Sequence, residues 1–99
     1  MGQREVIKKL QLYKDLVSEH FDIDKVVLFG SYATGKQNDD SDIDVAIIVN
    51  SLDSDFFIFA PLLWKLRHKV DDRIEPVLFV NGKDPSGFLQ EILKSGLTI

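Results

Sequence analysis

Residues 30–49 read "GSYATGKQNDDSDIDVAIIV", a polar loop that runs directly into a set of strand-forming residues. Two of its aspartates, Asp42 and Asp44, stand at the beginning of a strand predicted over 42–49. Side chains two apart in a strand point to the same side, so these carboxylates share one face. Burying carboxylates without partners is costly. The alternate positions point the other way and belong to the predicted core: Ile43, Val45 and Ile47.

A divalent cation is the partner that such a pair of carboxylates predicts. Two like charges at close range raise each other's pKa, and a cation removes that conflict. Carboxylate oxygens suit Mg²⁺ or Mn²⁺, which often completes its shell with substrate phosphates. Glu75, in a strand predicted over 73–80, is a third candidate ligand. If that strand lies beside 42–49 in register, three carboxylates converge, as two-metal phosphoryl transfer requires.

Gly30 and Ser31 supply a candidate phosphate site. They follow a short apolar strand predicted over 25–29, at a turn where free backbone N–H groups point outward and can bind phosphate. Each feature alone is typical of an ordinary turn or a solvated strand end. The combined pattern G-S-x10-D-x-D, however, would occur by chance on the order of once in a thousand chains of this length.

The remaining pattern predicts an α+β (α/β-like) domain with helices mainly on one face of a small sheet. Apolar residues at spacings of three and four predict a helix over 4–21. Residues 53–55 can cap a second helix, which contains Pro61 and ends near residue 70. Pro76 cannot donate to a ladder, so its strand is expected at an edge. Ser86 caps a last helix over 87–94 that stops at Gly96, and 97–99 is extended, giving three to four strands.

The amino-acid composition limits the classes of function that the chain can have. Ninety-nine residues suit one domain, spanning 1–99, and the absence of cysteine excludes thiolate metal sites and cysteine nucleophiles. The net charge of −4 argues against strong nucleic-acid binding. With no signal peptide and no apolar run of the roughly 20 residues that a membrane span needs, we expect a cytoplasmic protein.

The stretch "GSYATGKQNDDSDID" resembles the signature of the DNA polymerase beta-like nucleotidyltransferase superfamily. Gly30, Ser31, Asp42 and Asp44 meet its spacing in full, and "DDRIEPVLFV" resembles its third carboxylate strand, with Glu75 in place. The resemblance covers nearly the whole chain and is closest to the minimal nucleotidyltransferases of bacteria and archaea.

This resemblance implies a mixed sheet, ATP as the substrate and two Mg²⁺ ions. It assigns Gly30 and Ser31 to the triphosphate, Asp42 and Asp44 to both metals, and Glu75 to the catalytic metal or the base. Many relatives carry arginine where Thr34 stands, so a phosphate contact is weaker here or comes from Lys36.

Minimal members are commonly encoded beside an all-helical HEPN-domain protein, and in some pairs they neutralise this toxin by transferring AMP to a tyrosine. The resemblance therefore implies an antitoxin that is a protein adenylyltransferase. The alternatives are a binding module that masks a HEPN protein without catalysis, and a small-molecule nucleotidyltransferase that needs a partner subunit. A nucleic-acid polymerase is disfavoured, because the chain is acidic and has no room for a second lobe.

Other residues are expected to have structural roles. His20 and His68 are interpreted as surface residues, and Arg73 as the solvated end of a strand. Trp64 and the aromatic residues of 56–59 are interpreted mainly as core. Part of the segment "FFIFAPLLW" is a candidate contact for a protein partner.

Overall fold

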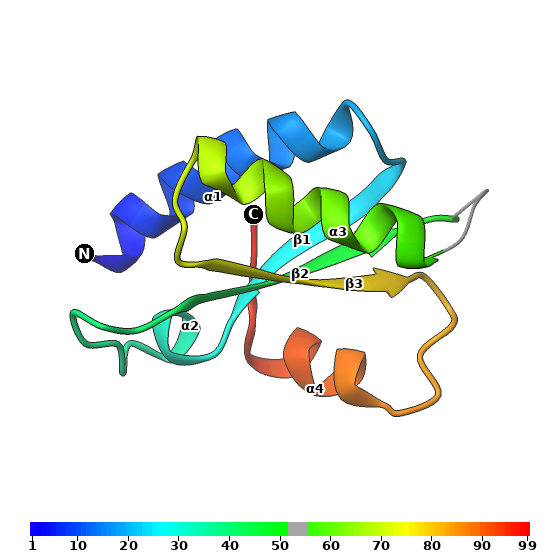
Figure 1. Cartoon of the computed structure of the whole chain (residues 1–99). Coiled ribbons are helices and arrows are strands. Elements are labelled where there is room, and N and C mark those ends of the chain that lie inside the picture. Colours follow the sequence, from blue (N-terminus) through cyan, green and yellow to red (C-terminus); the bar gives the residue numbers. More distant parts are fainter. Residues whose placement is uncertain (52–55) are drawn as a thin grey trace.

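The computed structural model describes residues 1–51 and 56–99, with the backbone alone for 56–59. It is a mixed four-stranded sheet with helices packed on both faces (Figure 1). The elements are α1 (Gln3–Ser18), β1 (Ile23–Phe29), α2 (Ser31–Thr34), β2 (Ile43–Val49), α3 (Phe56–Leu66), a 3-10 turn η1 (Arg67–Lys69), β3 (Ile74–Val80), α4 (Phe88–Ser95) and β4 (Leu97–Thr98). The predicted fold class is confirmed, and the predicted caps at 53–55 lie outside the described residues.

The sheet has the order β3-β2-β1-β4, with β2 parallel to β3 and antiparallel to β1. The strand β2 is central and is almost entirely buried, because helices cover both of its faces. Ile43, Val45 and Ile47 face the larger core beneath α1 and α3, as predicted. Ala46 and Ile48 face a smaller core against α4.

The helix α1 packs on the sheet through the stripe that its sequence periodicity predicted. Val6, Leu10, Tyr13 and Val17 are fully buried in the larger core, and Phe21 joins them just beyond the helix. Tyr13 also donates a hydrogen bond from Oη to the carbonyl oxygen of Leu63 in α3, at 2.7 Å. This bond ties the two helices together beneath the sheet.

The strand β3 lies at the edge of the sheet, as Pro76 predicted. The Ile43 N–H donates to the Arg73 carbonyl, so the Arg73 carbonyl faces β2. Backbone groups alternate sides along a strand, so those of Ile74 and Pro76 point outward. The outward carbonyl of Ile74 accepts a hydrogen bond from Arg67 Nη1 at 3.1 Å. Proline therefore removes a donor where no neighbouring strand needs one.

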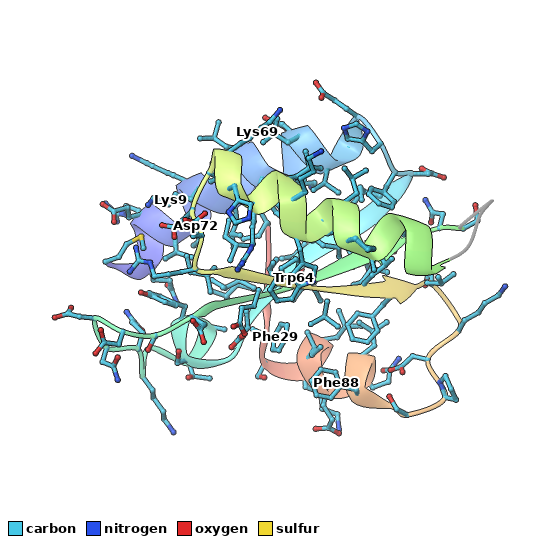
Figure 2. The ribbon with its side chains drawn as sticks, viewed as in Figure 1. Lys9, Phe29, Trp64, Lys69, Asp72 and Phe88 are labelled. Carbon is cyan, nitrogen blue, oxygen red and sulfur yellow. The ribbon has the colours of Figure 1, made fainter. Side chains whose placement is uncertain are left out.

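Trp64 is not a core residue, and this corrects the prediction. Its side chain is 42% exposed, and the guanidinium carbon of Arg67 lies 4.7 Å from its ring centroid (Figure 2). Leu63 and Leu66 take the buried positions of α3 instead. The helix buries its residues at 63 and 66, so position 64 is turned outward from the core.

An ion-pair network fixes the beginning of β3. Asp71 accepts hydrogen bonds from Lys9 of α1 at 2.7 Å and from Arg73 at 3.2 Å, and its side chain is only 9% exposed. Burial alone would raise the pKa of Asp71, but these hydrogen bonds outweigh it and hold the pKa well below its usual value. The network therefore stabilises the fold at neutral pH, and this contribution is lost as the pH falls through the lowered pKa.

The last helix was predicted over 87–94 with Ser86 as its cap, but it begins one residue later, at Phe88, and its N-cap is Gly87. The N–H of Phe88 donates to Ser86 Oγ at 3.2 Å, and the N–H of Leu89 donates to Asp84 Oδ2 at 2.6 Å. The helix ends at Gly96, and the chain then pairs with β1 as the two-residue strand β4. Among the described residues, no helix combines the length and apolar character required to cross a membrane.

Two buried tyrosines provide a matched test of the α1–α3 connection. We expect Tyr13→Phe to lower the free energy of unfolding by about 1 kcal/mol, because it removes a buried hydrogen bond. Tyr32 is equally buried, but within the described residues its Oη has no hydrogen-bond partner. We therefore expect Tyr32→Phe to leave stability unchanged or to increase it. Urea denaturation of both variants checks this, and equal losses for the two would contradict it.

Candidate active site

The structure brings the three predicted carboxylates together on one face of the sheet. Asp44 of β2 is the direct parallel partner of Glu75 of β3, so their side chains point the same way from adjacent strands. Asp42 is exposed just before β2, at the position that shares this face. The face is the one that carries α4, opposite the larger core.

The pKa values of Asp44 and Glu75 are both raised, by burial and by the negative charges beside them. Burial raises the pKa of Asp44, and the negative charge of Asp42 adds to it, while a hydrogen bond with Glu75 opposes the rise. Burial also raises the pKa of Glu75, as do the charges of Asp42 and Asp44 and a hydrogen bond with Asp42. In the absence of a cation, the neighbouring carboxylates therefore disfavour the ionised forms of Asp44 and Glu75.

The turn at Gly30 and Ser31 lies against this cluster. Gly30 has φ of 74°, and a Cβ at this position would overlap Asp44 Oδ2, so only glycine lets the turn approach the carboxylate. Ser31 begins α2, where the N–H groups of Ala33 and Thr34 donate to the carbonyl oxygen of Gly30. The N–H groups of Ser31 and Tyr32 have no backbone acceptor among the described residues. The turn thus places free backbone donors beside the three carboxylates.

Thr34 and Lys36 lie farther along the same loop. The Thr34 hydroxyl turns back to the turn, 3.4 Å from the carbonyl oxygen of Gly30 and 3.3 Å from that of Ser31. The Lys36 N–H donates to the Ser31 carbonyl at 3.0 Å, and its side chain is exposed. Thr34 therefore braces the turn, and Lys36 is the one cationic residue of the loop over 30–41.

The donor set suits Mg²⁺ or Mn²⁺, which prefer carboxylate oxygens. In the part of the chain that the structure describes, no three Asp, Glu, His or Cys side chains already stand in a geometry that could hold a metal ion. Burial and neighbouring negative charge raise the pKa values of Asp44 and Glu75, and a bound cation would relieve that cost. On this ground the donor chemistry of the three carboxylates fits a divalent metal.

Sequence reasoning missed Arg67 and the aromatic residues beside the site. The positive charge of Arg67 lowers the pKa of Glu75, although Arg67 lies in η1 and Glu75 lies in β3. Phe29 is the antiparallel partner of Asp44, on the side opposite Glu75. Neither could be found before the strand pairing was known. Arg73, in contrast, forms an ion pair with Asp71. His20 and His68 are exposed, as predicted.

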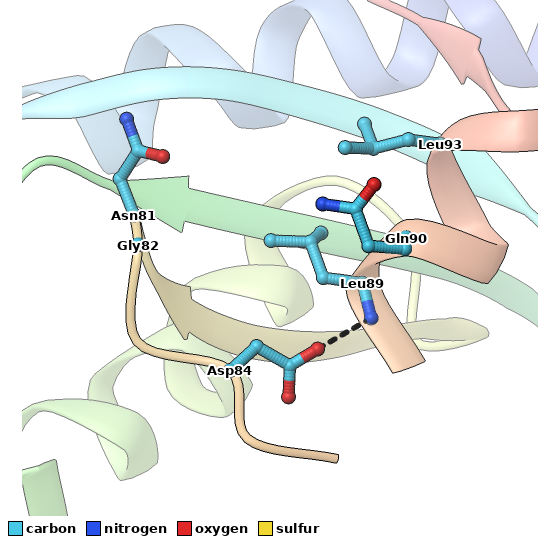
Figure 3. A pocket seen from close by; sticks show the side chains of 6 residues that line it. All are labelled: Asn81, Gly82, Asp84, Leu89, Gln90 and Leu93. Atoms are coloured by element: carbon cyan, nitrogen blue, oxygen red, sulfur yellow. Dashed lines mark hydrogen bonds between the residues drawn. The ribbon is translucent and has the colours of Figure 1, made fainter. Parts of the chain in front are cut away.

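A separate hollow of about 270 Å³ lies between the end of β3 and α4 (Figure 3). Its lining is Asn81, Gly82, Asp84, Leu89, Gln90 and Leu93. The one carboxylate there, Asp84, already accepts hydrogen bonds from Ser86 and from the N–H of Leu89. The hollow contains none of the predicted site residues. The candidate active site therefore lies at the carboxylates and not in this hollow.

Comparison with known proteins agrees with this geometry. The family model described as "Polymerase beta, Nucleotidyltransferase" matches residues 11–99. The chain is 36% identical over 76 residues to the "Putative protein adenylyltransferase MJ0604" of Methanocaldococcus jannaschii, an alignment that covers 75% of each chain. It is also 43% identical over 49 residues to MJ0141 of the same organism, which has the same descriptive name, covering 48% of each.

Two solved structures share the fold. A "putative nucleotidyltransferase" from Sulfolobus solfataricus superposes with a TM-score of 0.73 at 18% identity, covering 97% of this chain and 80% of that one. A chain from the structure of "the toxin-antitoxin with AMP-PNP" superposes with a TM-score of 0.63 at 23% identity, covering 99% and 72%. At these identities the likeness concerns the fold alone.

The family match extends over most of the chain. This confirms the resemblance that the sequence indicated, and with it the expectation of an enzyme. The chain belongs to the polymerase beta family of nucleotidyltransferases.

Proposed function

We propose that residues 1–99 form a single minimal catalytic domain that transfers AMP from ATP to a hydroxyl group of a partner protein in the cytoplasm. The observation that carries the proposal is the alignment of Asp44 with Glu75 beside the Gly30 turn. A fold without catalysis has no need to crowd carboxylates such as Asp44 and Glu75, whose pKa values are raised by burial and by neighbouring negative charge.

Each residue has a role in this proposal. Asp42, Asp44 and Glu75 hold two Mg²⁺ ions, which when bound supply positive charge that offsets the charge of the phosphates. Gly30 and Ser31 bind the triphosphate through the free N–H groups of the turn and the Ser31 hydroxyl. Lys36, exposed after α2, adds a cation at the outer end of the phosphates.

The reaction is a nucleotidyl transfer. The hydroxyl oxygen of the acceptor forms a bond to the α-phosphorus, the bond from that phosphorus to the bridging oxygen breaks, and pyrophosphate leaves. The proton of the hydroxyl passes to Glu75.

The proposed acceptor is a tyrosine of a helical HEPN-domain protein, which the modification silences, so that the chain acts as an antitoxin. The names of the relatives support protein adenylylation, and one neighbouring structure is a toxin-antitoxin with AMP-PNP.

Nucleotide binding is expected to stabilise the protein strongly. At one hundred times its dissociation constant, MgATP adds about 2.7 kcal/mol, which for a domain of this size raises the melting temperature by about 10–20 °C. Mg²⁺ alone gives a smaller rise, because it relieves carboxylate repulsion without adding phosphate contacts. Differential scanning calorimetry with and without each ligand measures this, and an unchanged transition in millimolar MgATP would count against the site.

Removing two carboxylates separates catalysis from folding. We expect Asp42→Asn combined with Asp44→Asn to slow AMP transfer by a factor of about 10³ or more. Without metal, the variant should melt at or above the wild-type temperature. The raised pKa values mean that the ionised forms cost folding free energy at neutral pH, and the substitutions remove that cost.

The matched control is Asp39→Asn combined with Asp40→Asn. These aspartates are exposed in the same loop and change the net charge equally, but they lie outside the strand face. The control variant should transfer AMP at the wild-type rate. If the Asp42/Asp44 variant did so too, the assignment of the metal site would be wrong.

The partner prediction is tested by mass. After incubation of this chain with a HEPN-domain protein from the same genome and MgATP, we expect a stable complex. We also expect the partner to gain one or more AMP units on a tyrosine, as intact-mass and peptide mass spectrometry would show. A partner that is bound, unmodified and silenced equally well by the Asp42/Asp44 variant would identify a binding module instead.

A further inference from the structure

Three phenylalanine rings meet on the face of the sheet that carries the carboxylates. Phe88 of α4 lies edge-on to Phe29 of β1, with centroids 6.0 Å apart and an interplanar angle of 84°. It stacks on Phe79 of β3, with centroids 6.1 Å apart and an angle of 16°. Figure 2 shows Phe29 and Phe88 together on the α4 side of the sheet. We call these three rings the aromatic platform.

The aromatic platform is continuous with the proposed phosphate and metal site. Phe29 is paired with Asp44 and directly precedes Gly30, so it lies at the level of the carboxylates. Phe79 is paired with Ile48, four residues farther along β2 than Asp44. Phe88 contacts both rings and therefore bridges the distance from the carboxylates to the middle of the sheet.

The aromatic platform keeps an open surface. Phe88 is 49% exposed, and Val77, which stands between Glu75 and Phe79 on the same face of β3, is 39% exposed. Alternate residues along a strand share a face and are about 7 Å apart. The apolar surface therefore begins at Val77, the next residue after Glu75 on that face. The buried residues of α4, Leu89 and Ile92, point into the smaller core, whereas Phe88 lies outside that core.

We propose that the aromatic platform, through Phe88, stacks the base of the nucleoside triphosphate whose phosphates lie at Gly30 and the carboxylates. The proposal rests on the proposed function, because it adds the base-binding part of the same site. A ribose separates the α-phosphate from the base, so a base that extends from the carboxylates along β3 arrives over the apolar surface. Stacking on a ring is tolerant of base identity, because every base has a flat π face.

The size of the surface favours a base over a protein face. A stable protein interface uses roughly 20–30 residues on each side. The platform and Val77 offer four side chains, of which two are more than a third exposed. A flat base covers such an area, and the uncharged rings suit the uncharged base, whereas the neighbouring turn and carboxylates suit phosphates and metal.

Calorimetric titration of Phe88 variants with MgATP and with magnesium tripolyphosphate tests the proposal. We expect Phe88→Ala to weaken MgATP binding by about 5- to 150-fold, the range that losing one base–aromatic stack costs. Binding of tripolyphosphate, which has no base, should be unchanged. Phe88→Trp should bind MgATP at least as well as the wild type. Phe88→Leu, which stays apolar but has no flat ring, should be weak like the alanine variant.

The control is Leu12→Ala, on α1 at the opposite side of the sheet, where the side chain is 61% exposed. It should bind both ligands as the wild type does, and melting curves of all variants establish that they are folded. Unchanged MgATP affinity in Phe88→Ala and Phe88→Leu would overturn the proposal, as would equal losses for the two ligands. Loss of transfer to the partner with unchanged MgATP affinity would also overturn it, and would assign the platform to the acceptor.

A wild-type protein that bound neither ligand would overturn both the platform and the proposed function. Wild-type binding of MgATP that Phe88 variants do not alter would overturn the platform alone. The two failures are therefore distinguishable in the same experiment.

Discussion

The parallel register of β2 and β3 places Asp44 beside Glu75, and the rest of the proposed site depends on that register. A slip of one residue would turn Glu75 into the larger core and expose Ile74, because side chains alternate faces along a strand. Burial of Ile43 and Ile74 opposes such a slip. Outside the sheet, Asp71 holds the start of β3 through Lys9 and Arg73, and Arg67 holds the carbonyls of Asp72 and Ile74. Residues far from the carboxylates thus fix where the carboxylates stand.

The two faces of the sheet are covered unequally, and this leaves room for chemistry. Beneath β2, α1 and α3 form the larger core together with buried residues of β1 and β3. On the other face, α4 packs on a smaller core that includes Val27, Ala46 and Ile48, with Phe29 and Phe79 partly buried against it (Figure 1). The end of that face at Asp44 and Glu75 stays partly open, with the Gly30 turn beside it. The raised pKa values of these carboxylates are the cost of this arrangement, and a bound cation is expected to relieve it.

Much of this could be predicted from the sequence, because local patterns determine it. The two-residue period of β2 predicted the common face of Asp42 and Asp44, Pro76 predicted the edge strand, and the stripe of α1 predicted its buried residues. The position of Glu75 was conditional on strand register, which depends on contacts distant in sequence. Trp64 was predicted wrongly, because an aromatic residue in an apolar run gives no information about which way the helix turns. Arg67 and Phe88 were missed, because only the packing of η1 and α4 brings them near the carboxylates.

The central claim is that three carboxylates from two strands share one site and repel one another until a cation binds. Carbon-detected NMR titration of the carboxyl groups of Asp42, Asp44 and Glu75, without metal and with Mg²⁺, tests it most directly. The account predicts that Asp44 and Glu75 titrate above ordinary aspartate and glutamate without metal. It also predicts that Mg²⁺ shifts both titrations to lower pH, while the carboxyl carbon chemical shift of the exposed Asp39 is the same with and without Mg²⁺. Ordinary pKa values for Asp44 and Glu75 that Mg²⁺ leaves unchanged would contradict the account.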